Sequence, residues 1–305
     1  MAEPQVVVIG SLNMDLVARA PRLPAPGETL LGRDLATVPG GKGANQAVAA
    51  ARLGARTAMI GCVGSDGFGA QLRAGLEGDG VDCRGVKELA GSSGVALIVV
   101  DDEGRNGIVV IPGANGRLGP EDVDAWEDLL TAAKVVALQL ETPLATVEHA
   151  ARRARALGRP VVLNPAPAQP LPPALVACAD FLVPNEVEAA ALTGIPVDSV
   201  DGAVAAAERL RAQGAGRVLV TLGARGVVVV GPEGASHQPA RPVKAVDTTA
   251  AGDTFIGGLC AALAAGKSVP EAVAWAQAAA ALSVTRPGAQ PSIPWAREVA
   301  GVMHA

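Results

Sequence analysis

Aromatic and basic residues are scarce in this sequence, and their scarcity excludes one class of partner. Among 305 residues there are three Phe, three Trp and no Tyr, and 25 Lys and Arg residues stand against 30 Asp and Glu, which gives a net charge of −5. Proteins that bind nucleic acids present a basic face, often with aromatic side chains interleaved. No arginine-rich tract of that kind occurs here. We therefore expect no nucleic-acid partner.

Cysteine and histidine are also few. The four cysteines, at positions 62, 83, 178 and 260, are far apart, and the three histidines are scattered along the chain. Disulfide frameworks and thiolate zinc sites need cysteines at short, regular spacings. The sequence therefore predicts small buried thiols in a reducing compartment, and it assigns no metal chemistry to histidine.

Long apolar segments are absent as well. The N-terminal stretch MAEPQVVVIG enters a predicted buried strand at once, without the basic region, apolar core and cleavage site of a signal peptide. Residues 255–265 form the most apolar long segment, which is too short to cross a bilayer. We expect a soluble, cytoplasmic protein without a membrane partner.

The chain is rich in short β-branched runs that alternate with alanine-rich helical stretches. Hydrophobic residues make up 50% of the sequence, which is enough for one large core. Uninterrupted apolar strands suit a parallel sheet covered on both faces, and the helices between them supply the crossovers. We predict an α/β fold, a three-layer α/β/α doubly wound, mostly parallel sheet, in a single domain over residues 1–305. The predicted strands cover residues 6–10, 57–64, 134–141, 160–166, 180–186 and 216–223, and the predicted helices cover residues 43–53, 121–133, 145–157 and 203–213.

Two stretches break this rhythm. Residues 16–39 contain several prolines and no helical period, and residues 94–111 form two β runs joined by a polar turn. We predict that these two insertions build a small β-sheet lid that closes over a site or pairs with another copy, because its edges need cover. Further along, short strands are predicted up to residue 247, followed by helical sequence from about 252 to 284.

The motif DTTAAGDTF, residues 247–255, places two carboxylates around very small side chains, just before a predicted helix. Backbone amides in the first turn of a helix lack intrahelical partners, and Gly or Ala lets an anion approach them. The amides of Ala250, Ala251 and Gly252 would form an anion hole for a transferred phosphoryl group, with Asp253 beside it as a general base. From the local sequence alone, an acidic residue that favours the helix dipole explains Asp253 equally well.

Two further motifs carry polar groups at the ends of predicted elements. In GGKGAN the glycines permit positive φ and close backbone approach, Lys42 offers a cation, and Asn45 can bond hydroxyls. The motif is not a Walker A loop, which needs Ser or Thr after its Lys. In GSLNMD, Asn13 and Asp15 follow the first strand, at the edge where doubly wound sheets bind ligands. Taken alone, each motif is also explained by an ordinary turn.

Together these motifs resemble the ribokinase family of carbohydrate kinases. GSLNMD, GGKGAN, LQLETP, NEVE, TLGARG and DTTAAGDTF occur in the order and approximate spacing of that family, from Val6 to about Trp295. The last motif combined with GGKGAN is highly specific, whereas NEVE or TLGARG alone is a weak signal. For the sugar, the resemblance implies that Asp253 activates the O5 hydroxyl and that the amides from Ala250 to Gly252 receive the γ-phosphate. The matching sugar-binding residues are Asn13, Asp15, Gly41, Lys42, Asn45, Glu141 and Asp253.

For the nucleotide, the resemblance implies contacts from NEVE to the phosphates and the hydration shell of Mg²⁺, and from TLGARG beneath the nucleotide. A helix cap at Asn185 and an ordinary turn between strands are the alternatives. Gln277 lies where the adenine pocket of relatives varies, and with so few aromatic residues the adenine must be held by aliphatic surfaces. The matching residues are Asn185, Glu188, Thr221, Gly223, Gly226, Gly252 and Gln277.

The resemblance also implies a monovalent-cation site for K⁺ beside the anion hole, built from carbonyl and hydroxyl oxygens with the Asp247 carboxylate balancing the charge. A loop punctuated by Pro and Gly is the alternative. The matching residues are Asp247, Thr249, Ser283, Arg286, Gly288 and Ser292.

The resulting hypothesis is ATP-dependent phosphorylation of D-ribose at O5, with ATP, Mg²⁺ and K⁺ as cofactors and a homodimer formed through the lid. Two alternatives stay open: a kinase of this family that acts on another sugar or on a nucleoside, and a non-catalytic sugar-binding protein on the same fold. The first strand is followed by no G-x-G-x-x-G turn, which argues against a nicotinamide-dependent oxidoreductase.

Overall fold

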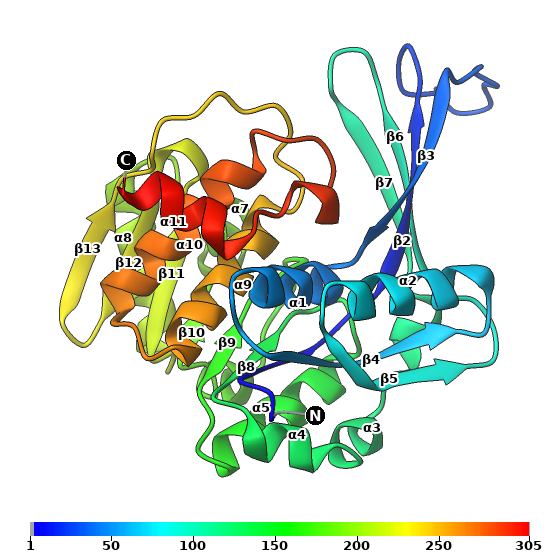
Figure 1. Ribbon diagram of the computed structural model, residues 1–305. Helices are drawn as coiled ribbons and strands as arrows, with labels where there is room; N and C mark the ends of the chain where they lie inside the picture. Colours follow the sequence, from blue (N-terminus) through cyan, green and yellow to red (C-terminus); the bar gives the residue numbers. More distant parts are fainter. Residues whose placement is uncertain (1–2, 305) are drawn as a thin grey trace.

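Two β-sheets organise the molecule (Figure 1). The computed structural model describes residues 3–304. The larger sheet has the strand order β13-β12-β11-β10-β9-β8-β1-β4-β5; it is parallel from β11 to β5, and β12 and β13 are antiparallel at one edge. Its strands are β1 (Val6–Ile9), β4 (Thr57–Gly64), β5 (Asp82–Leu89), β8 (Val135–Leu138), β9 (Val161–Leu163), β10 (Phe181–Leu182), β11 (Arg217–Thr221), β12 (Val227–Gly231) and β13 (Gly234–Gln238).

Helices cover both faces of this sheet because its strands are apolar on both sides. In β1, Val6 and Val8 belong to one core and Val7 and Ile9 to the other, so the predicted α/β/α layers are confirmed. The first core packs against α1 (Lys42–Arg52), α2 (Gly67–Gly78), α9 (Ala251–Ala264), α10 (Val269–Ser283) and α11 (Ala296–His304). The second packs against α3 (Pro120–Asp124), α4 (Glu127–Ala132), α5 (Leu144–Ala156), α6 (Pro173–Val176), α7 (Glu186–Thr193) and α8 (Val200–Ala212).

The order of the strands defines where a ligand can enter. From β1 the chain continues to β4 and β5 on one side, and it later returns to β8 and the following strands on the other side. Doubly wound sheets bind ligands in the crevice outside the carboxyl ends of the strands at such a switch point. The segments that leave β1 and β8 here carry Asn13 and Glu141.

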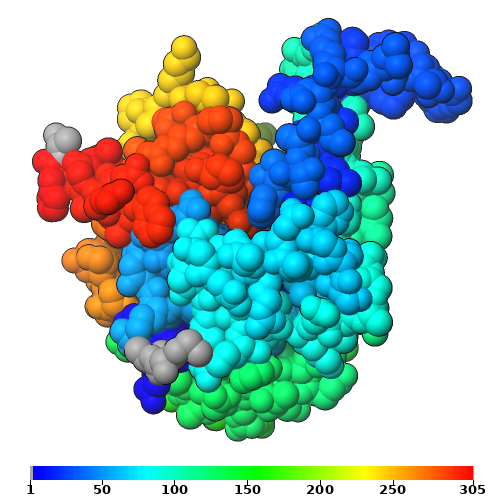
Figure 2. All heavy atoms as spheres, turned by 45° about the vertical axis from the view of Figure 1, so that its right-hand side comes forward, coloured from blue at the N-terminus to red at the C-terminus, as the bar shows by residue number. Residues whose placement is uncertain are grey.

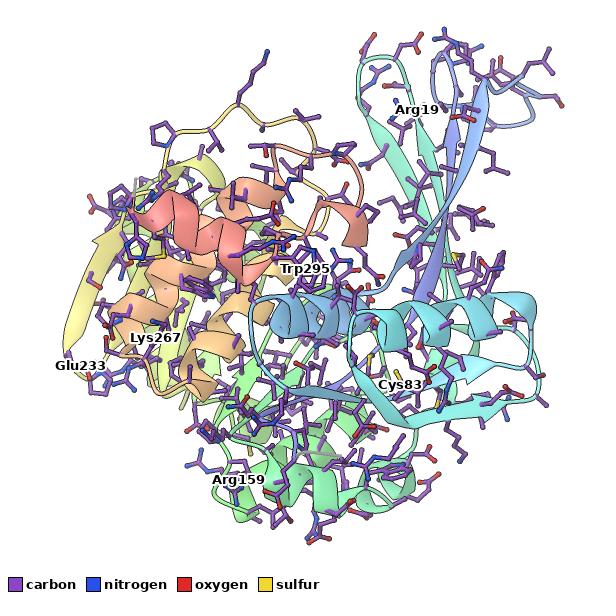
Figure 3. All side chains as sticks on the ribbon, viewed as in Figure 1. Arg19, Cys83, Arg159, Glu233, Lys267 and Trp295 are labelled. Carbon is purple, nitrogen blue, oxygen red and sulfur yellow. The ribbon has the colours of Figure 1, made fainter. Side chains whose placement is uncertain are left out.

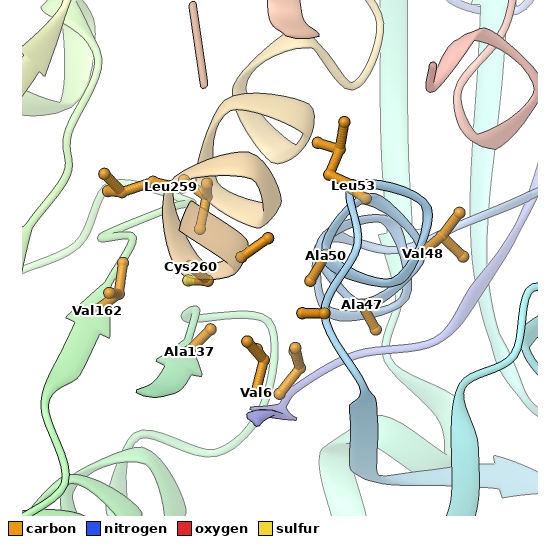
Figure 4. Packing of buried hydrophobic residues seen from close by; sticks show 14 of the residues in the cluster. Val6, Ala47, Val48, Ala50, Leu53, Ala137, Val162, Leu259 and Cys260 are labelled. Atoms are coloured by element: carbon orange, nitrogen blue, oxygen red, sulfur yellow. The ribbon is translucent and has the colours of Figure 1, made fainter. Parts of the chain in front are cut away.

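Helices α1 and α9 approach each other closely over this part of the sheet (Figure 4). A Cβ atom on Gly257 would lie 2.4 Å from the Ala49 Cβ, and 2.7 Å from both the Ala50 amide nitrogen and the Gln46 carbonyl oxygen. Only a glycine permits that approach, because two of the three neighbouring atoms belong to the backbone. As a result, the N-terminal turns of α1 and α9 lie side by side at the carboxyl edge of the sheet.

The second sheet has the order β3-β2-β6-β7 and projects from the body as an arm (Figure 2). Its strands are β2 (Asn13–Arg19), β3 (Asp34–Gly40), β6 (Gly94–Val100) and β7 (Asn106–Ile111), and Arg19 marks the outer end of β2 in Figure 3. Large apolar side chains of this sheet are exposed, with Leu35 at 66% and Val109 at 61%. The small separate sheet expected from the two insertions is therefore present, and β2 begins at Asn13, three residues before the first insertion.

One predicted helix and one longer stretch of predicted helical sequence are each divided into two helices. The stretch 121–133 forms α3 and α4, because the chain turns at Trp126, whose amide donates to the Val123 carbonyl at 3.1 Å. The stretch 252–284 forms α9 and α10, because Gly266, with φ of 80°, ends the first helix. Such breaks depend on tertiary packing and leave only weak signals in composition.

The short strands predicted after β13 are absent between residues 239 and 250, which have no regular secondary structure. Pro239 and Pro242 lack an amide hydrogen, and this discourages a further sheet ladder there. No helix within residues 3–304 is both long and apolar enough to cross a membrane.

Candidate active site

Asp253 lies in the first turn of α9 and is 8% exposed. Its Oδ2 accepts a hydrogen bond from the Asn45 amide at 2.9 Å, and its Oδ1 accepts one from the Gln46 amide at 3.0 Å. Both donors belong to α1, so the carboxylate bonds a neighbouring helix and does not cap its own. Burial raises the pKa of Asp253, while the Lys42 charge and the two amide donors oppose that rise.

The carboxylate faces a cavity of about 210 Å³ and does not turn into the core. Lys42, Asn185, Glu188 and Thr221 line the same cavity, together with the first turn of α9. Two larger hollows, of about 590 and 470 Å³, lie elsewhere on the surface and do not adjoin Asp253. The small cavity therefore unites a carboxylate, a cation and a helix N-terminus.

The first turn of α9 has an unusual backbone. Ala250 has φ of 58°, and within residues 3–304 it is the one residue other than glycine with a positive φ. Backbone strain of this kind concentrates at functional sites. The Ala251 amide donates to the Thr248 carbonyl at 3.2 Å, so one of the three amides expected in the anion hole already has a partner. Ala250 and Gly252 line the cavity without such a bond to Thr248.

Glu141 links the segments after β1 and β8 to the start of α1. Its Oε2 accepts hydrogen bonds from the Ser11 hydroxyl at 2.6 Å, the Lys42 amide at 3.0 Å and the Asn13 amide at 3.5 Å. Gly41 makes this arrangement possible, because its φ is 88° and a Cβ there would lie 2.6 Å from the Asn13 nitrogen. The ends of β1 and β8 are thus joined at the N-terminus of α1.

Asp15 completes a group of carboxylates around Lys42. Burial, followed by the charges of Glu141 and Asp253, raises the pKa of Asp15 to about 7. Burial alone would lower the pKa of Lys42, but Asp253, Glu141, Glu188 and Asp15 together raise it. Lys42 therefore stays charged at neutral pH.

The pKa of Asp15 leads to a prediction about stability. The unfolded chain releases this proton near the ordinary pKa of 3.8, whereas the folded protein retains it up to about pH 7. The folded state thus binds more protons in this window, and the contribution of Asp15 to the free energy of unfolding falls as the pH rises from about 4 to 7. Urea unfolding at pH 5 and pH 7.5 should show Asp15→Asn becoming more stable relative to the wild type at the higher pH. An equal difference at both pH values would contradict the raised pKa.

Sequence reasoning missed several buried polar residues that hold the site together. Asn115 donates to the Asn13 Oδ1 at 2.7 Å and so orients that side chain. Gln46 bonds Asp253 directly and directly follows Asn45 in the chain, which was the available signal. Asn164 lines the cavity with Asp253. No local pattern marked Asn115 and Asn164 as site residues, because both are far from the site motifs in the sequence. One lies in a 3₁₀ turn and the other at the end of a strand, where asparagine is common.

Asn185 and Glu188 form a capping box at the start of α7. The Asn185 Oδ1 accepts from the Glu188 amide at 2.8 Å, and the Glu188 Oε2 accepts from the Asn185 amide at 2.8 Å. The helix-cap interpretation of this motif therefore holds. Both side chains also line the cavity with Asp253, so the cap places them where a ligand would lie.

The TLGARG segment is a turn between β11 and β12, in agreement with the ordinary-turn interpretation. Gly223 and Gly226 have φ of 53° and 96°, and a Cβ on Gly226 would lie 2.1 Å from the Gln238 carbonyl oxygen. Gln277 donates to that same carbonyl at 3.0 Å and lines a separate cavity of about 300 Å³. Thr221, at the other end of the segment, lines the cavity of Asp253. This turn thus lies between the two cavities.

Asp247 joins two segments that are distant in sequence. Its Oδ1 accepts from the Thr249 amide at 2.9 Å and hydroxyl at 2.6 Å, and its Oδ2 accepts from the Gly288 amide at 2.8 Å. Burial alone would raise the pKa of Asp247, but these hydrogen bonds hold it below its ordinary value. Carboxylate, hydroxyl and carbonyl oxygens of this kind suit a hard cation, so the residues here fit a K⁺ ion.

The remaining residues expected at the cation site turn to local partners. The Ser283 hydroxyl donates to the Ala280 carbonyl at 2.9 Å, and the Ser292 hydroxyl to the Ala289 carbonyl at 2.8 Å. Arg286 bonds Glu298 at 2.5 Å. The two hydroxyls donate their hydrogens there and keep oxygen lone pairs that a cation could use, whereas the Arg286 guanidinium offers none. Within residues 3–304, no group of three or more His, Cys, Asp or Glu side chains is placed to hold a metal.

A buried carboxylate, a lysine and a helix N-terminus at the switch point of a doubly wound sheet, with a small sheet beside them, fit a small-molecule kinase. The chain belongs to the pfkB family of carbohydrate kinases, whose model matches residues 3–296. This confirms the family resemblance found in the motifs.

Individual relatives agree with that assignment. The chain is 45% identical to a ribokinase of Haemophilus influenzae over 294 aligned residues, and the alignment covers 96% of each chain. It is 41% identical to a deoxyribokinase of Salmonella typhi over 291 aligned residues, and this alignment covers 95% of each chain. The structure of Arabidopsis thaliana ribokinase complexed with ribose and ATP superposes with a TM-score of 0.92 at 33% identity, over 100% of both chains.

Proposed function

We propose that this chain catalyses the ATP-dependent phosphorylation of D-ribose at O5, which gives D-ribose 5-phosphate and ADP. One observation carries the proposal: the Asp253 carboxylate shares a cavity with Lys42 and the strained first turn of α9. The backbone amide of Lys42 in turn donates a hydrogen bond to Glu141, which also accepts one from the Asn13 side chain. Ribokinases from Haemophilus influenzae and Arabidopsis thaliana match almost the whole chain.

In the proposed reaction the sugar lies between the base of the lid and α1. Asn13, Asp15, Glu141, Lys42 and Asn45 bind its hydroxyls, and the backbone at Gly41 allows the close approach. Asp253 accepts the proton of the O5 hydroxyl as the O5–phosphorus bond forms and the bond from the γ-phosphorus to the bridging oxygen breaks, so that ADP leaves. Its raised pKa makes it a stronger base than an ordinary carboxylate.

The chain stabilises the transferred group by charge and by backbone amides. The Ala250 and Gly252 amides lie at the positive end of the α9 dipole and receive the γ-phosphoryl oxygens, with the Ala251 amide joining them if it leaves Thr248. Lys42 adds a full positive charge to the same cavity. Most of the rate enhancement then comes from positioning and electrostatics.

The nucleotide would extend from this cavity along the β11–β12 turn. Asn185 and Glu188 lie near its phosphates, where Mg²⁺ would accompany ATP and neutralise phosphate charge. Thr221, Gly223 and Gly226 lie beneath it, and the cavity at Gln277 takes the adenine. The aliphatic character expected for the adenine pocket fits Ala274 and Ala278 in that lining.

An ADP-release assay over a panel of sugars tests the function. We expect ribose to give the highest kcat/KM, ahead of deoxyribose, fructose and adenosine. Deoxyribose is the critical comparison, because one relative is a deoxyribokinase and one hydroxyl contact separates the two substrates. A faster reaction with another acceptor would replace ribose as the substrate, and binding of ribose without ADP release would favour the non-catalytic alternative.

Potassium is expected to increase the rate of this reaction. Asp247 and Thr249, with backbone oxygens near Ser283, Arg286, Gly288 and Ser292, would hold the ion and order the segment that precedes α9. Replacing K⁺ by choline at constant ionic strength should lower kcat, and Asp247→Ala should abolish the response to K⁺. Asp201→Ala, at an exposed carboxylate in α8, is the control and should respond as the wild type does. A K⁺ response that survives in Asp247→Ala would place the ion elsewhere.

The lid and the cysteines support two further parts of the proposal. Its exposed apolar side chains, such as Leu35, Leu97 and Ile108, favour a homodimer formed through this sheet, which light scattering of the intact protein would detect. The four cysteines are free and buried, in agreement with a cytoplasmic location, where ATP is at hand.

A further inference from the structure

The carboxylate of Asp253 is held by a buried chain of amides that the proposed reaction does not use. Gln46 is 0% exposed, and its Nε2 lies 3.0 Å from the Asp253 Oδ1 and 3.3 Å from the Asn164 Oδ1. Its Oε1 accepts from the Gln139 Nε2 at 2.6 Å. Gln46 does not line the cavity, so it acts on the site through Asp253 and Asn164, the two cavity residues to which it donates.

The neighbours of Gln46 determine which end of its amide faces the carboxylate. Gln139 donates to the Gln46 oxygen, and this leaves the NH₂ group pointing to Asp253. Asn164 agrees with this orientation, because its own Nδ2 donates to the Val183 carbonyl at 3.0 Å and its Oδ1 is free to accept from Gln46. Every hydrogen bond in the chain has a donor facing an acceptor.

Gln139 is buried beside Gln46, and its own Oε1 has no hydrogen-bond partner within residues 3–304. It is 0% exposed, and a Cβ on Gly10 would lie 1.9 Å from its Oε1. The absence of a side chain at Gly10 therefore leaves the space that Gln139 occupies at the end of β8. Gln46 thus accepts a hydrogen bond from the end of β8, two residues before Glu141, and donates one to Asn164, whose amide is anchored to the Val183 carbonyl.

We propose that Gln46 is a positioning residue which, oriented by its hydrogen bonds to Gln139 and Asn164, holds Asp253 as an ionised carboxylate and fixes its direction towards the cavity. This inference rests on the proposed function, in which Asp253 is the general base. Asn45 occupies the other carboxylate oxygen, so the two neighbouring amides of α1 clamp both oxygens. Without Gln46 the carboxylate would keep one donor and gain freedom to rotate.

The effect on proton affinity follows from the groups that face Asp253. Lys42 from α1 favours the charged form, whereas burial, Glu141 after β8, Glu188 of α7 and Asp15 of β2 disfavour it. A hydrogen bond to a charged group is worth roughly one to two pKa units. Loss of the Gln46 donor should therefore raise the pH at which Asp253 loses its proton by that amount.

The test compares pH profiles of kcat/KM. Gln46→Leu should move the acidic limb to higher pH by about one to two units, with much of the rate recovered at high pH. Gln139→Leu, which leaves Gln46 in place but removes one of the two side chains that orient its amide, should move the acidic limb in the same direction by less. Thr254→Val is the control, because Thr254 is buried beside Asp253 and its hydroxyl has no partner within residues 3–304; its profile should match the wild type. A uniform loss of rate at every pH in Gln46→Leu, with no shift, would overturn the proposal.

A second measurement separates this inference from the proposed function. The difference in urea midpoint between the wild type and Gln46→Leu should grow as the pH rises, because the donor matters most when Asp253 is ionised. In an Asp253→Asn background that pH dependence should vanish. If it persists there, Gln46 does not act through Asp253, and this result holds whether or not any sugar is phosphorylated.

Discussion

Replacing Asp253 with asparagine is expected to lower kcat by about 10²- to 10⁴-fold, the usual contribution of a positioned general base. That loss corresponds to about 3–5 kcal/mol of transition-state stabilisation. Asparagine keeps the size of the side chain but cannot accept the proton of a sugar hydroxyl in the same way. Ribose binding, measured by calorimetry, should persist, because the other sugar contacts stay in place.

The environment of Asp253 makes this substitution informative. Both carboxylate oxygens accept hydrogen bonds from side-chain amides of α1, so an asparagine NH₂ would meet a donor and one neighbouring amide would have to flip. Asp201→Asn makes the same change in the exposed first turn of α8 and should leave kcat unchanged. Turnover by Asp253→Asn at the wild-type rate would remove Asp253 from the mechanism.

Substitution of Gly257 by alanine should affect both stability and activity. The added Cβ would collide with backbone atoms of α1 at 2.7 Å, and overpacking of this kind costs about 1–3 kcal/mol. If α1 and α9 move apart, Asn45 and Gln46 lose their contact with Asp253, and a displacement of about 1 Å can lower kcat by about 10²-fold. Urea unfolding and the ADP-release assay would measure the two effects.

Gly75 provides the matched control for this prediction. It lies in α2, and a Cβ there would meet nothing within 4 Å. Gly75→Ala should therefore raise stability by up to about 1 kcal/mol, through the better helix propensity of alanine, and leave kcat unchanged. If both variants behaved alike, the close approach of α1 and α9 would not be what holds Asp253 in place.

Much of the fold was predictable because its signals are local. β4 occupies residues 57–64 as predicted, and the predicted helix at 43–53 appears as α1, shifted by one residue at each end. The alternation of apolar strands with helical segments is enough to determine a doubly wound sheet. The split between α3 and α4 was missed, since the turn at Trp126 depends on how the two helices pack against the sheet.

The site was predictable only where its residues lie in short motifs. Asp253, Lys42 and Asn45 lie in segments rich in glycine and alanine. Such segments indicate a place where another group approaches the backbone closely, because few side chains permit that approach. Asn185 shows the limit of this reasoning: its motif was compatible with a helix cap or a ligand contact, and the structure has the cap at the edge of the cavity. At Ser283 and Ser292 the hydroxyls turn to their own local carbonyls, which no spacing could indicate.

The amino-acid sequence by itself determined the layers of this protein, the family to which it belongs, and the presence of a carboxylate in the first turn of a helix. It could do so because hydrophobic periodicity and small-residue motifs act over a few neighbouring residues. The tertiary structure alone decided that Gln46 joins Gln139, Asn164 and Asp253 through hydrogen bonds between residues 93 to 207 positions apart. Such convergence depends on the packing of α1 against α9 and the sheet, and hydrogen bonds between distant segments leave no periodic trace along the chain.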